Sequence, residues 1–157
     1  MDLLDVLTEE SIALDVEADD WRDSIRQVGR VLVETGAIEP RYIDAMIRTV
    51  EQIGPYLVLA PGVAMNHARP EDGVNRVCLG LVRLRTPVNY GSAHNDPVDI
   101  VIALGAVDHE AHLKLLRDLA CFLSDEENIR RVRRASTKQE VIAAFRRCAE
   151  RAAGGQS

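Results

Sequence analysis

The chain has 157 residues, of which 46% are hydrophobic and 28% are charged, as in an ordinary globular domain rather than a disordered or fibrous chain. Its formal net charge of −6 opposes unspecific binding to nucleic acid or to anionic membranes. The apolar runs are far shorter than the roughly 20 residues of a membrane helix, and the first residues lack the features of a secretory signal. We therefore expect a cytoplasmic protein with no nucleic-acid partner and no insertion into a membrane.

The first third of the chain predicts a strand followed by two helices. Apolar residues alternate over 11–16, which is the period of a half-buried strand. Over 21–35 they recur at helical spacing, and Asp19 or Asp20 can cap that helix. A second amphipathic helix is expected over 40–53, opened by a proline and ended by Gly-Pro.

The middle of the chain is rich in predicted strands, and the last third is helical. Two short strands are expected over 56–60 and 63–65, flanking a Pro-Gly turn, with longer buried strands over 77–84 and 98–104. The prolines and small polar residues of 86–97 predict an irregular segment. Two more helices are expected, carrying the apolar sets listed here: Leu113, Leu116, Leu119, Ala120 and Leu123 in one, and Val141, Ile142 and Phe145 in the other.

This order of elements predicts an α/β fold, with one sheet covered by helices on both faces. No internal repeat or linker divides the sequence. We therefore expect a single domain over residues 1–152 and a flexible tail over 153–157.

Two other groups of residues receive structural interpretations. Arg130, Arg131, Arg133 and Arg134 form a basic cluster that we interpret as the solvated face of a helix. The three cysteines, Cys78, Cys121 and Cys148, are widely spaced and form no C-x-x-C pair. We interpret them as reduced residues that mostly serve packing.

His67 is the strongest candidate for chemistry among the four histidines. It lies where a predicted strand meets a loop, a position from which a rigid scaffold can present a side chain to a partner. Arg69 follows two residues later, and its guanidinium can hold phosphate oxygens through paired hydrogen bonds. A phosphate group could therefore be held next to His67.

His109 and His112 stand three residues apart at the start of a predicted helix, so they share one face. Together with His67 they could form a zinc-like cluster if the fold brought them together. Alternatively, one of them near His67 could hydrogen-bond a transferring phosphoryl group, helped by free N–H groups of the helix start. The sequence contains none of the glycine-rich nucleotide motifs and no nucleophile elbow.

Several segments, in order along the chain, resemble IIA components of the mannitol-fructose class of the bacterial phosphotransferase system, with the ascorbate branch as the nearest match. The most specific is the stretch 54–73, Gly-Pro-Tyr-Leu-Val-Leu-Ala-Pro-Gly-Val-Ala-Met-Asn-His-Ala-Arg-Pro-Glu-Asp-Gly. Further segments that carry the resemblance are 39–46, 95–99, 106–108 followed by His112, and 123–128.

The resemblance implies a phosphocarrier whose His67 is phosphorylated by the small carrier HPr, with His112 as a second active-site histidine that assists transfer. The next acceptor would be a cysteine of a IIB component, and a IIC membrane permease would move ascorbate or a similar carbohydrate. The family fold is a mixed β-sheet sandwiched between α-helices on both faces. In this scheme Arg69 and His112 steady the phosphoryl oxygens, and neither a metal nor another cofactor is required.

The chain departs from the family at Asn66, because the residue before the phosphorylated histidine is typically proline. An asparagine there can hydrogen-bond to the backbone or to phosphate. Two other functions stay open at this point: a IIA-like regulatory protein whose phosphorylation state controls a binding partner, and a zinc-dependent hydrolase built on His67, His109 and His112. The sugar and the existence of a homodimer also stay open.

Overall fold

The computed structural model describes residues 3–154 and contains a five-stranded sheet with the strand order β1-β4-β5-β3-β2. The strands are β1 (Ile12–Val16), β2 (Val58–Ala60), β3 (Val63–Asn66), β4 (Cys78–Val88) and β5 (Val98–Gly105). The α-helices are α1 (Leu3–Val6), α2 (Trp21–Glu34), α3 (Pro40–Ile53), α4 (His109–Leu123), α5 (Glu126–Arg134) and α6 (Lys138–Gly154). Short 3-10 helices occur at η1 (Glu9–Ser11), η2 (Pro55–Leu57) and η3 (Pro70–Asp72).

The sheet is mixed, and β5 lies at its centre. β5 pairs antiparallel with β4 on one side and parallel with β3 on the other, while β1 runs parallel to β4 and β2 antiparallel to β3. The sheet has a hydrophobic core on each face. Six of the eight residues of β5 belong to one of these two cores and are nearly inaccessible to solvent: Val98, Ile100, Val101, Ile102, Ala103 and Leu104. A strand buried on both faces reads as a continuous apolar run, as the sequence does here.

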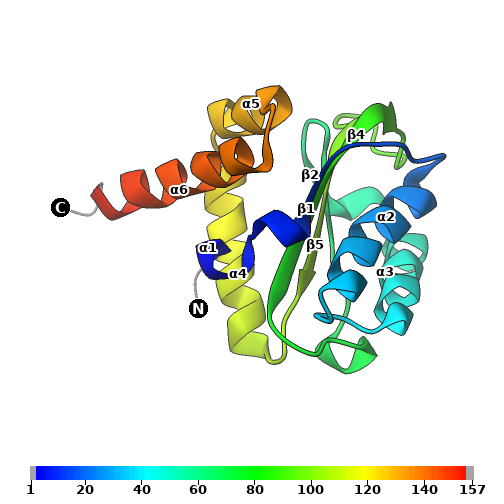
Figure 1. The fold of residues 1–157 in the computed structure, drawn as a ribbon. Helices are drawn as coiled ribbons and strands as arrows, with labels where there is room; N and C mark the ends of the chain where they lie inside the picture. Colours follow the sequence, from blue (N-terminus) through cyan, green and yellow to red (C-terminus); the bar gives the residue numbers. More distant parts are fainter. Residues whose placement is uncertain (1–2, 155–157) are drawn as a thin grey trace.

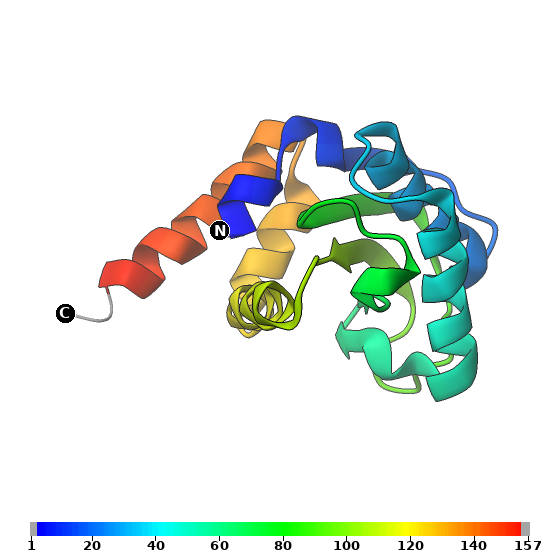
Figure 2. The same ribbon diagram turned by 90° about the horizontal axis from the view of Figure 1, so that it is seen from below.

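Helices cover both faces of the sheet, which confirms the predicted layering (Figures 1 and 2). The core on one face is formed with α2 and α3, and the core on the other with α1, α4, α5 and α6. β3 shows how the alternation works, because Val63 and Met65 belong to one core and Ala64 to the other. Residues next to each other at the end of β3 therefore reach opposite sides of the sheet.

Local signals place α2 and α3 where the sequence predicts them. The Asp20 side chain accepts a hydrogen bond from the Asp23 N–H and so caps α2. After α2 the chain turns at Gly36, whose φ of 77° suits a residue without a Cβ. Pro40 occupies the first position of α3, where its missing N–H costs nothing.

The structure corrects the prediction that 86–97 is wholly irregular, because β4 continues to Val88. Val88 pairs with Val98 of β5 after a register shift that follows Arg83. The neighbouring strand β1 ends opposite Leu84, so the last part of β4 has a free edge on that side. Pro87 is tolerated at such an edge because no neighbouring carbonyl there needs its missing N–H.

The basic cluster on α5 is not simply a solvated face. The Arg133 guanidinium donates to both carboxylate oxygens of Asp99, with distances of 3.0 and 3.1 Å from its Nε. It also donates to the carbonyl of Pro61 at 2.7 Å. Arg133 therefore fastens α5 to the β2–β3 turn and to β5, a contact between segments far apart in the sequence.

Two further expectations concern the cysteines and the C-terminus. Cys78 is buried, in line with a packing role, but Cys121 is exposed and Cys148 is only partly buried. α6 continues to Gly154, and the rest of the expected tail lies outside the described residues. No helix in the described part of the chain is long and apolar enough to span a bilayer.

Candidate active site

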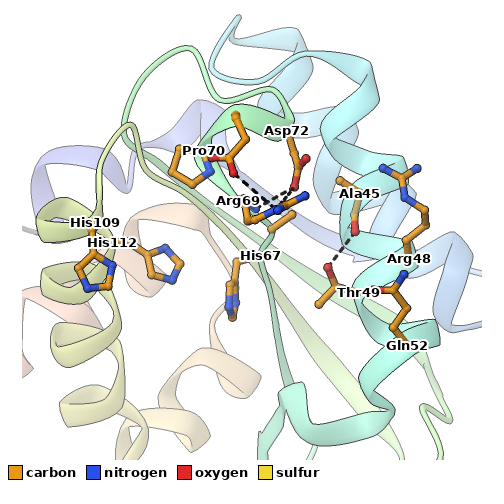
Figure 3. Close-up of a pocket in the computed structure, with 12 residues that line it drawn as sticks. Ala45, Arg48, Thr49, Gln52, His67, Arg69, Pro70, Asp72, His109 and His112 are labelled. Carbon is orange, nitrogen blue, oxygen red and sulfur yellow. Dashed lines mark hydrogen bonds and ion pairs between the residues drawn. The ribbon is translucent and has the colours of Figure 1, made fainter.

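His67 lies directly after β3, and His112 lies in the first turns of α4, which follows β5. Because β3 and β5 are parallel and in register from Val63 with Ile100 to Asn66 with Ala103, their carboxyl ends meet at one edge of the sheet. The two imidazole rings approach there, with a distance of 4.9 Å between ring centroids and an angle of 58° between ring planes. The structure thus brings together the two histidines that the sequence singled out (Figure 3).

Tyr42 of α3 holds the segment that carries His67. Its hydroxyl accepts a hydrogen bond from the Ala68 N–H at 2.9 Å and donates to the Leu104 carbonyl at 2.7 Å. The side chain is fully buried, and burial raises the pKa of the phenol far above its usual value. A single neutral hydroxyl therefore joins α3, the residue after His67 and the end of β5.

α4 presents His112 through a well-formed helix start. The Asp108 side chain accepts a hydrogen bond from the Ala111 N–H at 2.8 Å, which caps the helix. His109 and His112 are one turn apart, and both line the cavity that contains His67. The first turn of a helix also carries N–H groups without intrahelical partners and the positive end of the helix dipole, which favour an anion.

The surroundings of both histidines lower their pKa values, which favours the neutral form of each ring. Burial lowers the pKa of His67, and the neighbouring His112 lowers it further. Burial also lowers the pKa of His112, with His109 as the second cause. The Nδ1 atom of His67 is buried without a hydrogen-bond partner among the described residues, so Nε2 is the nitrogen available to the cavity.

The cavity is open to solvent and has a volume of about 890 Å³. His67 lies between α4 on one side and Arg48, Thr49 and Gln52 of α3 on the other, as Figure 3 shows. Arg48 is exposed, and no ion pair or hydrogen bond of its side chain is found among the described residues. Its charge is therefore free to attract an anion into the cavity.

Arg69 also lines the cavity, but its guanidinium faces carboxylates. Its Nε lies 3.6 Å from Glu71 Oε1 and 3.6 Å from Asp72 Oδ2, and its side chain is 76% exposed. Exposed ion pairs of this kind are weak and exchange readily. The expected contact of Arg69 with phosphate would thus require the side chain to turn away from these partners.

Asn66 points away from the cavity. It is fully buried on the side of the sheet opposite His67, where Nδ2 donates to the Ile102 carbonyl at 3.3 Å. Its Oδ1 has no hydrogen-bond partner among the described residues. The Asn66 side chain lies near the Tyr90 hydroxyl. The sequence predicts that Asn66 hydrogen-bonds either to the backbone or to phosphate, and the structure shows the bond to the backbone.

The three histidines of the zinc alternative, His67, His109 and His112, all line this cavity. Among the described residues, however, no group of three or more His, Cys, Asp or Glu side chains is arranged to hold a metal ion. His94, the fourth histidine, lies in a separate depression next to Arg133.

Sequence reasoning missed Arg48 and the bonding role of Tyr42. The apolar pattern of the helix assigned Tyr42 to the core, but its two hydrogen-bond partners are 26 and 62 residues away in the chain. Arg48 lies on the solvent side of an amphipathic helix, where an arginine is unremarkable in sequence. Only the folded structure, in which Arg48 of α3 and His67 line the same cavity, shows that this side borders it.

Comparison with known proteins places this chain in a family. The family model described as "Phosphoenolpyruvate-dependent sugar phosphotransferase system, EIIA 2" matches residues 5–148. The chain belongs to this EIIA type 2 family. An ascorbate-specific PTS system EIIA component from Shigella boydii is 44% identical over 144 residues, which cover 90% of this chain and 94% of that relative.

Solved structures agree with this assignment to the EIIA type 2 family. The mannitol-specific cryptic phosphotransferase enzyme IIA of Escherichia coli has a TM-score of 0.83 and 32% identity, over 94% of this chain and 99% of that one. The mannitol IIA enzyme of E. coli, solved in complex with phosphorylated enzyme IIB, has a TM-score of 0.78 and 26% identity, over 88% and 96%. This chain is thus a IIA component of the sugar phosphotransferase system with a mannitol-type fold.

Proposed function

We propose that this EIIA protein accepts a phosphoryl group from phosphorylated HPr on Nε2 of His67 and donates it to a cysteine of a IIB component. The observation that carries the proposal is the position of the His67 ring beside His112 in an open cavity, at the meeting ends of β3 and β5. The IIC permease that the IIB component serves would take up ascorbate or a similar carbohydrate, as the relatives' names suggest.

Each transfer is a substitution at phosphorus. In the first step the Nε2 lone pair attacks phosphorus, and the P–N bond to the donor imidazole breaks, leaving its electron pair on the donor ring. In the second step a cysteine thiolate attacks the same phosphorus, and the P–Nε2 bond breaks. The lowered pKa of His67 supports this chemistry because a protonated ring has no lone pair to offer at Nε2.

The surrounding groups would stabilise the charge that spreads over the phosphoryl oxygens. His112 is close enough to His67 to contact a phosphoryl group on it, and the start of α4 adds N–H groups. Arg48 and Arg69 supply positive charge from the other walls of the cavity. We assign Arg69 a role in binding phosphate once it leaves Glu71 and Asp72.

Intact mass after incubation with phosphoenolpyruvate, enzyme I and HPr tests the acceptor. The wild-type chain should gain one phosphoryl group, about 80 Da, and His67→Ala should gain none. His94→Ala is the matched control, because His94 lies outside this cavity, and it should gain the same mass as wild type. A wild-type chain that stays unmodified, or a gain that survives in His67→Ala, would contradict the proposal.

The second step and the carbohydrate need a separate measurement. Purified phosphorylated protein should lose its phosphoryl group to a IIB component of the ascorbate system, with the group recovered on a cysteine. Transfer to a mannitol IIB component but not to the ascorbate one would overturn the proposed carbohydrate while leaving the acceptor residue intact. A protein that is phosphorylated but donates to neither IIB component would favour a regulatory role.

A further inference from the structure

A groove between α5 and α6 carries an excess of positive charge. It has a volume of about 340 Å³, and it is lined by Arg131 and Arg134 of α5 and by Arg147 of α6. Glu140 adds one negative charge, so two positive charges remain in excess, although the chain as a whole carries −6. Figure 1 shows α5 and α6 packed next to each other, on the opposite side of the sheet from α2 and α3.

The arginines of this groove have few partners within the protein. No ion pair or hydrogen bond of the Arg134 or Arg147 side chain is found in the described part of the chain. The Nη1 atom of Arg131 is buried and has no hydrogen-bond partner among the described residues, and its Nη2 lies 3.7 Å from Glu127 Oε1. Each guanidinium stays charged and carries five N–H donors, so an anion in the groove would find donors that are not in use.

The end of α5 does not account for Arg134. A basic residue in the last turn of a helix can serve the carbonyl groups that have no partner within the helix. In this protein Arg83 of β4 already does so. Its Nη1 donates, over 2.6 to 3.2 Å, to three carbonyls at the end of α5, those of Val132, Arg133 and Ala135. Arg134 is therefore left for solvent or for a ligand.

The chemistry of the groove matches a small anion with two adjacent phosphoryl groups. A guanidinium holds phosphate oxygens through paired, charge-assisted hydrogen bonds. A single carboxylate would neutralise half of the excess charge, whereas a diphosphate carries enough charge and enough oxygens for three guanidinium groups. The volume lies at the lower end of the range for small-molecule sites. Small apolar side chains complete the lining, from Ala135, Ala143 and Ala144.

We propose that the groove lined by Arg131, Arg134 and Arg147 is a binding site for the diphosphate group of a small molecule. The ligand is either free diphosphate or a nucleoside diphosphate, which present the same group to the arginines. The site is independent of the proposed phosphoryl transfer, because it shares no lining residue with the cavity around His67.

Titration of the full chain with pyrophosphate in metal-free buffer tests the site, with the arginine Nε–H signals followed by NMR. The signals of Arg131, Arg134 and Arg147 should shift together with one affinity. In the double variant Arg134→Gln, Arg147→Gln, the affinity read from the Arg131 signal should fall about tenfold or more, because two charged hydrogen-bond donors are lost. Both substituted residues are exposed, so the variant should unfold in urea as wild type does.

Arg146→Gln is the matched control. Arg146 is exposed and adjacent to Arg147 but does not line the groove, so this variant should bind pyrophosphate as wild type does. A parallel titration with ADP distinguishes the two ligands, since tighter binding of ADP identifies a nucleoside diphosphate and equal or weaker binding identifies free diphosphate.

Three results would overturn the proposal. The first is a shift confined to Arg48 and Arg69 in the cavity around His67, or no shift at all. The second is an unchanged affinity in the double variant. The third is an equal loss in Arg146→Gln and in the double variant, which would show attraction to general surface charge.

Discussion

Tyr42 shows how much of the site depends on one hydroxyl group. Its hydroxyl accepts a hydrogen bond from the N–H of Ala68 and donates one to the Leu104 carbonyl near the end of β5, so it fixes the direction in which the chain leaves β3. β3 is held in place by its backbone hydrogen bonds to β5. The short segment after it, which carries His67, lies beyond the sheet edge and is held by the Tyr42 hydroxyl instead. Tyr42, which the sequence assigns to the hydrophobic core, thus also helps to position His67.

Tyr42→Phe should destabilise the protein by about 1–3 kcal/mol, since it leaves the partly buried Ala68 N–H and the buried Leu104 carbonyl without their partner. We expect the phosphorylation rate to fall as well, because the His67 segment loses its tie to α3. Urea unfolding and the rate of mass gain with phosphorylated HPr measure the two effects. Tyr90→Phe, which removes a buried hydroxyl bonded to Ser24, should cost stability but leave Ala68 and Leu104 paired. Equal rates in the two variants would contradict the role of Tyr42.

At the scale of elements, α4 connects the fold to the chemistry. Its first turn holds His109 and His112 at the cavity, and Leu115, Leu119 and Phe122 anchor its other side in the core. The cap at Asp108 decides where the helix begins, so it also decides where His112 lies.

Asp108→Ala should cost about 1 kcal/mol of stability, the usual effect of a lost N-cap, and should slow phosphorylation by loosening His112. Asp125→Ala is the matched control, because Asp125 caps α5 in the same way, through the Glu127 N–H at 3.0 Å. Denaturation should show similar losses for both variants, and only Asp108→Ala should change the transfer rate. If both variants transfer at the wild-type rate, the position of His112 does not depend on this cap.

Local signals predicted most elements, and long-range contacts explain the rest. Asp20, Gly36 and Pro40 mark helix ends through the chemistry of neighbouring residues, so α2 and α3 could be placed from sequence. The extension of β4 to Val88 depends on pairing with Val98, and the role of Arg133 depends on Asp99, which precedes it by 34 residues. Periodicity carries no information about such partners.

The same limit applies to the site. His67 could be singled out because a histidine between strand and loop is conspicuous, and the family resemblance pointed to His112. The resemblance did not indicate that Asn66 would be buried opposite the cavity; the alternation of β3 shows it. Arg48 has no local signature, since only the packing of two distant segments makes it a neighbour of His67.

For the whole molecule, the lowered pKa values of His67 and His112 make stability depend on pH. The pKa values of these histidines are lowered from 6.5 in the folded state. As the pH falls below about 6.5, the unfolded chain therefore binds more protons than the folded protein does. The free energy of unfolding should therefore decrease on acidification through this window and be retained above it.

Urea denaturation at pH 7.5 and at pH 5.5 measures this dependence. The double variant His67→Gln, His112→Gln should lose less stability between these pH values than wild type, since neither glutamine titrates. An NMR titration of the two rings should place both midpoints below 6.5, the value they would have in an unfolded chain. An equal loss of stability in both proteins would show that other groups dominate the acid response.

The central position of β5 has a consequence for synthesis on the ribosome. Without β5 the sheet falls into two unconnected pairs, β1 with β4 and β3 with β2. β5 is also the last strand to be translated, so neither pair can join the other until residue 105 has left the exit tunnel. The sheet can form from that point on, whereas the core built with α4, α5 and α6 and the pairing of His67 with His112 must wait until those later helices have emerged as well.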